Sequence, residues 1–231
     1  MRPVRKGDCP LDEHGNKVAF KRYQDARRYL VERIGPFCSY CEMKLPVGLA
    51  VEHIQPKSLH GKNELEWDNL LLACASCNSC KLAKDVNPDN IDEFLWPDKN
   101  NTFSALAYSE GGTVRVNPAL VSAEERNRAQ NLIELVGLDE KHFFSQRTSE
   151  KWNDRRKEWD KAMEIKKDLE QNDSEAAREM IVKMIDGYFS IWMTVFSDNP
   201  DMRQRILRHF EHFGTAMECF EEVDELIERL K

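Results

Sequence analysis

The spacing of apolar residues predicts a mixture of helix and strand in the first half of the chain. Over residues 18–34, apolar side chains recur every three or four positions between basic ones, which predicts an amphipathic helix that ends at Gly35. Residues 37–81 form a turn-rich stretch, and residues 102–116 alternate around a Glu-Gly-Gly turn, which predicts a short hairpin.

In the second half the same spacing predicts helices alone. Ser122 and Glu125 form a capping box that opens a helix running to about Val136, and Gly137 ends it. Long amphipathic patterns follow, separated by Asn, Asp, Pro and Gly, at residues 148–171, 174–197, 200–213 and 215–230.

Composition limits the class of protein. The 231 residues are 41% hydrophobic and 32% charged, which excludes a low-complexity disordered chain. No apolar run approaches the roughly 20 residues of a membrane span, and the first residues lack the apolar core of a secretory signal peptide. We therefore expect a cytoplasmic α+β protein with no membrane contact, divided into an α+β domain at 1–118 and an all-helical domain at 119–231.

Five of the seven cysteines lie within the turn-rich stretch. Cys38-x2-Cys41 and Cys74-x2-Cys77 are two knuckles of the kind that supply four thiolates to a structural Zn²⁺. Cys80 could replace one member of the second knuckle, but we assign the ligand set to the first four cysteines and treat Cys80 as a bystander. The alternative is a set of buried free thiols that pack as small apolar residues.

Four polar residues accompany the knuckles. Glu52 and His53 are adjacent within an apolar frame, and Asn69 and Asn78 follow. Neighbours in an extended strand point to opposite faces, so Glu52 and His53 reach one site only at a bend or hairpin. A lone His is usually a core residue, and the asparagines alone would be a turn former and a helix cap; their coincidence favours a catalytic site.

Three short motifs follow one another in this segment: Glu52-His53-x-x-Pro56-Lys57-Ser58, Asn69-Leu70-Leu71 and Cys74-x2-Cys77-Asn78-x2-Lys81. In this order they resemble the HNH endonuclease family, and more narrowly the HNH nuclease subunit of the Septu anti-phage defence system, including its retron-associated versions. The resemblance is close over residues 37–84 and loose elsewhere. It implies a small ββα-metal nuclease core that hydrolyses DNA phosphodiester bonds.

The resemblance also implies a role for each polar residue. His53 is expected to be the general base, which suits an imidazole that is neutral at cellular pH. Glu52 and Asn78 are expected to hold the catalytic ion, Mg²⁺ or Mn²⁺; many members of the family have Asp or His at the first position, and Glu extends one methylene farther than Asp. Asn69 is expected to orient the base through nearby backbone.

The charge distribution bears on how nucleic acid is held. The formal net charge is -7, and all of the excess acid lies in residues 101–231, whereas residues 1–34 carry 9 basic against 5 acidic residues. The residues expected to contact phosphates are Arg27, Arg28, Lys57, Lys81 and Lys84. The resemblance implies a partner ATPase in a hetero-oligomer, docked by the helical domain, which would compensate for this small basic surface.

Three interpretations of function remain open. The first is the effector nuclease of an ATPase–nuclease defence complex, and the others are a free-standing restriction-type HNH DNase and a non-catalytic zinc-binding interaction module. The dense apolar stretch at residues 188–196 is either a buried core helix or a surface for the partner, and its hydrophobicity on all sides favours the core.

Overall fold

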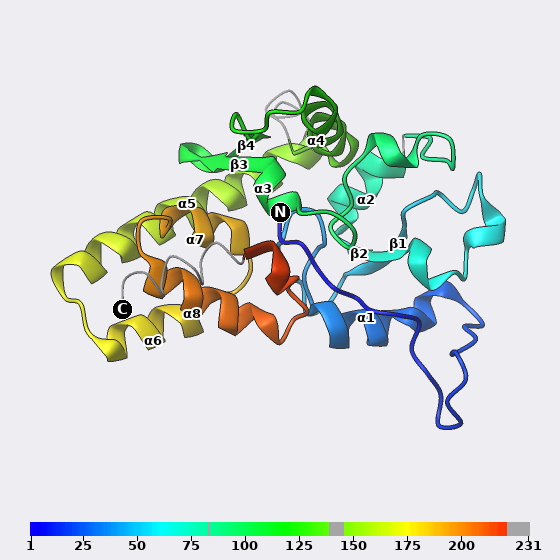
Figure 1. Cartoon of the computed structure of the whole chain (residues 1–231), viewed down its shortest axis with the longest axis horizontal. Coiled ribbons are helices and arrows are strands. Elements are labelled where there is room, and N and C mark those ends of the chain that lie inside the picture. The colour runs from blue at the N-terminus through cyan, green and yellow to red at the C-terminus, as the bar shows by residue number, and fades with distance from the viewer. Residues whose placement is uncertain (83, 139–145, 221–231) are drawn as a thin grey trace.

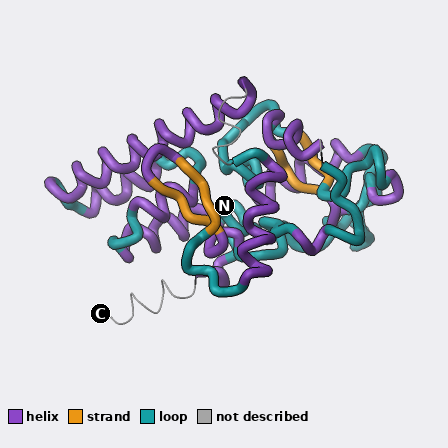
Figure 2. The backbone as a smooth tube through the Cα atoms, turned by 90° about the horizontal axis from the view of Figure 1, so that it is seen from above, coloured by secondary structure: helices purple, strands orange, loops and turns teal. Residues whose placement is uncertain are grey.

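The computed structural model describes residues 1–82, 84–138 and 146–220 of the chain. Figure 1 shows a long helical part on one side and the cysteine-rich segment on the other, with the N-terminus near the centre. Within these residues there are two separate antiparallel strand pairs, β1–β2 and β3–β4, which Figure 2 shows apart from each other. The structure is α+β, and its later part is helical.

The cysteine-rich segment folds as a hairpin followed by a helix. Strand β1 (Ala50–His53) pairs antiparallel with β2 (Leu70–Ala73), with His53 opposite Leu70, and α2 (Ala75–Leu82) follows at once. All four residues of β2 are buried, as the unbroken apolar run Leu70–Leu72 requires. This ββα unit places the end of β1 beside α2.

The helix predicted over residues 18–34 is shorter than expected. The structure has a 3₁₀ turn, η1 (Tyr23–Ala26), that continues into α1 (Arg27–Ile34). The helical conformation starts late because Arg22 is extended and Asp25 accepts from its backbone N–H, which fixes the start of η1. Residues before this point form a loop instead, in which the Val18 N–H donates to the Pro10 carbonyl.

The predicted hairpin over residues 102–116 is confirmed in its second part. Strands β3 (Leu106–Ser109) and β4 (Thr113–Val116) pair through the turn η5 (Glu110–Gly112), while the start of the segment forms one helical turn, α3 (Thr102–Ala105). Gly112 has φ +70, and a Cβ there would lie 2.5 Å from the Arg156 backbone nitrogen. The turn therefore packs directly on the long helix α5 (Gln146–Gln171).

The helical part agrees with the predicted pattern except at one break. Helix α4 (Ala123–Val136) begins where the Ser122 side chain accepts from the Glu125 N–H, and left-handed Gly137 ends it. The pattern predicted over residues 174–197 is instead two helices, α6 (Glu175–Met184) and α7 (Phe189–Val195), and α8 (Pro200–Glu211) follows. The short 3₁₀ turn η7 (Met217–Phe220) ends the described chain, and the rest of the pattern predicted over 215–230 lies outside it.

The break between α6 and α7 has a tertiary cause. Gly187 forms a bridge with Met43, and a Cβ there would lie 2.8 Å from the Glu42 carbonyl oxygen. The Glu42 carboxylate then accepts from the backbone N–H and the hydroxyl of Ser190, in the first turn of α7. These contacts with Glu42 and Met43, next to the first cysteine knuckle, interrupt the helix predicted over residues 174–197.

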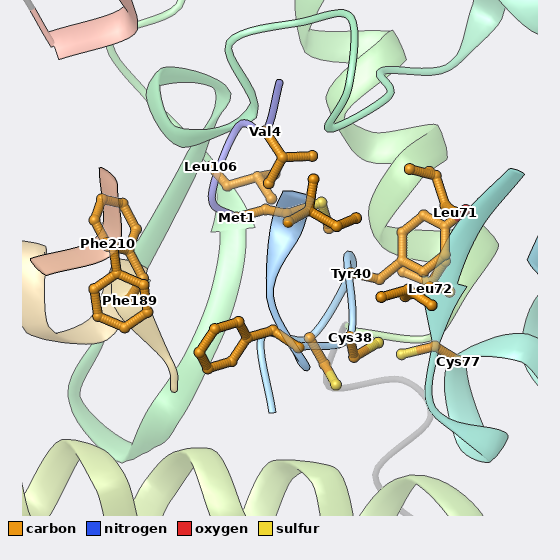
Figure 3. Close-up of a cluster of buried hydrophobic side chains, with 14 of the residues drawn as sticks. Met1, Val4, Cys38, Tyr40, Leu71, Leu72, Cys77, Leu106, Phe189 and Phe210 are labelled. Atoms are coloured by element: carbon orange, nitrogen blue, oxygen red, sulfur yellow. The ribbon is translucent and has the colours of Figure 1, made fainter. Parts of the chain in front are cut away.

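One apolar core runs through both halves. It joins Leu71 and Leu72 of β2 to Phe189 of α7 and Phe210 of α8, and Figure 3 shows Met1 and other residues between them. The stretch at residues 188–196 is core, as predicted: its buried apolar members are Phe189, Ile191, Trp192, Met193, Val195 and Phe196. The division into domains at residue 118 stays a prediction. No described helix is long and apolar enough to span a membrane.

Candidate nuclease and metal sites

The four predicted zinc ligands meet in space. Cys38 and Cys41 lie before β1, Cys74 lies between β2 and α2, and Cys77 lies in the first turn of α2. All four are buried, and their sulfur atoms lie within 4.8 Å of one another. Cys80 is half-buried and is not part of this group.

The sulfur geometry fits zinc. The Cys41 and Cys74 sulfur atoms are 3.8 Å apart, too far for a disulfide. Four sulfurs placed tetrahedrally at about 2.3 Å from zinc are separated by about 3.8 Å. In the described part of the chain, no other group of His, Cys, Asp and Glu forms such a cluster. The cysteines can therefore hold a structural Zn²⁺.

A buried lysine from the helical part faces the thiolates. The Lys151 ammonium lies 3.8 Å from the Cys77 sulfur and donates to the Val136 carbonyl at 2.9 Å. Burial acts to lower the pKa of Lys151, but the thiolates of Cys77 and its neighbours outweigh it and raise that pKa. Four thiolates around Zn²⁺ carry a net charge of about -2, so this cation offsets part of it.

Glu52 and His53 border one cavity, at the point where β1 ends in a bend at residues 54–55. They are the last two residues of β1, and the cavity beside them has a volume of about 230 Å³. Its other lining residues come from η1, β1, the loop after β1 and helix α2: Tyr23, Val51, Pro56, Lys57, Ser58, Asn78 and Lys81. Three of the four polar residues singled out in the sequence therefore share this pocket.

Backbone contacts define which nitrogen of His53 can accept a proton. The Nε2 atom lies 3.0 Å from the Glu64 carbonyl oxygen, which can only accept, so Nε2 carries the hydrogen. In the neutral ring Nδ1 then holds the free lone pair. Burial lowers the pKa of His53 below 6.5, against smaller opposing effects of the Glu64 carbonyl and the Glu52 charge, so the ring is neutral at pH 7.

Asn69 binds the backbone around His53 rather than the pocket. Its Oδ1 accepts from the Gln55 N–H at 2.7 Å, and its Nδ2 donates to the Gln55 and Asn63 carbonyls at 3.1 and 3.0 Å. Asn63 immediately precedes Glu64, whose carbonyl contacts His53. The side chain thus joins the two loop segments that flank the imidazole.

Glu52 and Asn78 are suitable in kind for a divalent ion. Glu52 is 2% exposed, and its carboxylate accepts from Tyr40 Oη at 2.7 Å and pairs with Lys81 Nζ at 2.8 Å. Each carboxylate oxygen keeps a further lone pair, and the half-buried Asn78 amide borders the same cavity. Asn78 lies inside α2, where its N–H donates to the Cys74 carbonyl, so it does not cap that helix. Carboxylate and amide oxygens are the ligands that Mg²⁺ and Mn²⁺ accept alongside water and phosphate.

Lys81 differs from its expected role as a phosphate contact. Its side chain is 2% exposed, and the ammonium donates to the His53 and Ile54 carbonyls at 2.6 Å each, besides pairing with Glu52. An ammonium has three hydrogens, and these three partners use them all. Lys81 therefore supports the end of β1 from inside the fold.

The other predicted phosphate contacts differ in exposure. Arg28, Lys57 and Lys84 are exposed, and Lys57 lies beside the cavity, where it pairs with Glu64 at 3.3 Å. Arg27 is half-buried because its Nε donates to the Leu49 carbonyl at 3.0 Å.

Two residues of the site were not predicted from the sequence: Tyr23, which contacts His53, and Lys6, which contacts the turn around Asn69. The Tyr23 ring lies edge-on to the His53 ring with centroids 4.7 Å apart, and the Lys57 ammonium lies 4.3 Å from the centre of the Tyr23 ring. The buried Lys6 reaches the turn that contains Asn69. A basic or aromatic residue in an N-terminal segment has no motif spacing that would identify it.

The comparisons with known proteins agree with the geometry. The chain has no match among curated protein sequences. The family model that does match, that of the HNH endonucleases, covers residues 38–84, which are the knuckles, the β1–β2 hairpin and α2. This segment is therefore an HNH endonuclease domain, and the protein that carries it is a nuclease of the hydrolase class.

Proposed function

We propose that the protein is a metal-dependent endonuclease that hydrolyses DNA phosphodiester bonds with His53 as general base. One observation carries the proposal. His53 borders a polar cavity together with Glu52 and Asn78, while the Glu64 carbonyl fixes the hydrogen on Nε2 and leaves Nδ1 free to accept. This is the arrangement that proton removal from an attacking water requires.

Two neighbouring side chains support this role because they hold the backbone next to the imidazole in place. Asn69 and Lys81 fix the backbone on either side of the imidazole, so its orientation does not depend on substrate. A general base contributes about 10² to 10⁴ in rate, and only when it is held in line with the proton it takes.

We assign the catalytic ion to Glu52 and Asn78. A bound Mg²⁺ or Mn²⁺ supplies Lewis-acid stabilisation of the negative charge that develops on the phosphate and the leaving oxygen. The Lys81 ammonium neutralises much of the Glu52 charge, so this pair offers a modest electrostatic attraction to a cation by itself.

The proposed DNA contacts are Lys57 beside the cavity, together with Arg27, Arg28 and Lys84. This basic set is small, and the sequence pI is about 5.5. Non-specific DNA affinity comes mainly from neutralised phosphates, so a protein with few such contacts binds DNA weakly alone.

We further propose that the protein is the effector nuclease of a Septu-like defence complex and that residues 119–231 dock its ATPase. The motif order in residues 37–84 and the acidic second half support this version. The free-standing restriction-type nuclease is its alternative, and it differs in one respect: it cleaves without an ATPase.

The test is plasmid cleavage by the purified protein in EDTA, Mg²⁺ or Mn²⁺, with and without a co-expressed neighbouring ATPase, beside Asn78→Ala. We expect cleavage only with a divalent ion, and a loss of about tenfold or more in Asn78→Ala, at least as large as the loss when a group that supports a metal ligand is removed. Dependence on the ATPase selects the defence complex over the free nuclease. Absence of cleavage of DNA and RNA in every mixture would support the non-catalytic zinc module instead.

A further inference from the structure

Lys6 belongs to the N-terminal segment, outside the matched residues 38–84, yet its side chain enters the nuclease domain. It is 6% exposed, and its ammonium donates to the carbonyls of Trp67, Asp68 and Leu70 at 3.1, 3.1 and 3.0 Å. It also pairs with the Asp98 carboxylate at 2.8 Å. A buried ammonium is tolerated only when oxygens replace its hydration, and these four do so.

The three carbonyls bracket one residue. Trp67 and Asp68 precede Asn69 in the turn η3 (Trp67–Asn69), and Leu70 follows it at the start of β2. The carbonyl of Asn69 itself accepts from the Ile54 N–H at 2.8 Å, on the other strand. Lys6 therefore fixes the backbone on both sides of Asn69.

Asn69 connects this fixed turn to the imidazole of His53 through two hydrogen bonds. Its amide donates to the Asn63 carbonyl, and the next residue, Glu64, presents the carbonyl that lies 3.0 Å from His53 Nε2. Displacement of the Asn69 turn would displace that carbonyl, and with it the contact that selects the tautomer of His53. Lys81 anchors the opposite strand at the carbonyls of His53 and Ile54, so the two buried lysines hold both sides of the site.

We propose that Lys6 is a positioning residue of the nuclease site, which acts through Asn69 and Glu64 to keep Nδ1 of His53 as the accepting atom. The proposal rests on the proposed function, in which His53 is the general base. The nuclease site then requires a residue of the N-terminal segment, which lies outside the ββα unit.

The test compares Lys6→Met with Arg5→Met. Arg5 is its neighbour and carries the same charge, but it is exposed and pairs with Glu218, so its loss is the matched control. We expect Lys6→Met to lose about 10-fold to 100-fold in kcat for plasmid cleavage, with KM changed less than about threefold, as for other residues that orient a catalytic group. Arg5→Met should cleave like the wild type.

A second readout does not depend on activity. The ¹⁵N shifts of the His53 ring should report hydrogen on Nε2 in the wild type and in Arg5→Met, and a mixture of both tautomers in Lys6→Met. Asp98→Asn keeps an oxygen for Lys6 and removes only the ion pair, so we expect its kcat to stay within about threefold of the wild type. If Lys6→Met does not fold, Lys6→Gln, which retains two donors, should show the same changes to a smaller degree.

A folded Lys6→Met or Lys6→Gln with wild-type kcat and a single Nε2-protonated ring would overturn the proposal. Loss through KM alone, with unchanged ring shifts, would overturn it too. Wild-type cleavage by His53→Ala is a different failure: it would remove the proposed function itself, whatever the ring shifts of the Lys6 variants show.

Discussion

The four-cysteine cluster that can hold zinc and the pocket around His53 are both built on the same ββα segment, but in different ways. The zinc site consists of four buried cysteines whose sulfur atoms already lie within 4.8 Å of one another. The pocket is a cavity of about 230 Å³ whose central imidazole is positioned by backbone carbonyls and by residues behind it. The imidazole is held in place through side chains from outside the segment, such as Lys6, whereas Lys151, which reaches the cysteines from outside it, supplies charge and not a ligand.

This difference follows from the chemistry of each site. A structural zinc ion needs only four soft donors at tetrahedral positions, and two short knuckles supply them. A general base must be held in one tautomer and one direction, which requires hydrogen bonds from several parts of the fold. The knuckles are a frame, and the pocket depends on that frame and on the buried lysines.

The largest expected effect comes from breaking the frame. Cys74→Ser, or removal of zinc by a strong chelator, should unfold the 37–84 segment, because the structural ion of a small zinc module contributes on the order of 10 kcal/mol. Zinc content and thermal unfolding measure this, and cleavage should disappear as well. Cys80→Ser is the control and should keep one zinc ion per chain. Unchanged zinc and unchanged unfolding in Cys74→Ser would contradict the ligand assignment.

The smallest expected effect lies at the rim of the pocket. Lys57→Gln should reduce the slope of log affinity for DNA against log salt by about 1, because one phosphate contact is lost. Its effect on kcat at saturating DNA should be slight. DNA binding at several salt concentrations measures the slope, and Lys99→Gln, an exposed lysine that does not border the cavity, is the control. An unchanged slope in Lys57→Gln would remove this lysine from the interface.

Local patterns in the sequence predicted the frame well. The spacing of two CxxC pairs predicted that Cys38, Cys41, Cys74 and Cys77 meet in space, because each pair forms a tight turn that can face one ion. The N-cap at Ser122 and the stop at Gly137 were also predicted, since both depend on neighbours in the chain. Such features need no knowledge of distant contacts.

Features set by distant contacts were not predictable in this way. The helical pattern over residues 174–197 is interrupted because Gly187 meets Glu42 and Met43, which lie far away in sequence. Lys81 was expected to face a phosphate, and it lies inside because the end of β1 offers it two carbonyls and the Glu52 carboxylate. Lys6 has no motif at all, and only the folded chain brings it to the Asn69 turn.

The measurement that tests the central claim most directly is plasmid cleavage by His53→Ala beside His60→Ala. His60 lies seven residues farther along, next to the turn η2 (Gly61–Asn63), and does not border the cavity. The account predicts that His53→Ala loses about 10³-fold in cleavage rate while it keeps its zinc and its unfolding temperature, and that His60→Ala cleaves within about threefold of the wild type. Wild-type cleavage by a folded, zinc-loaded His53→Ala would contradict it.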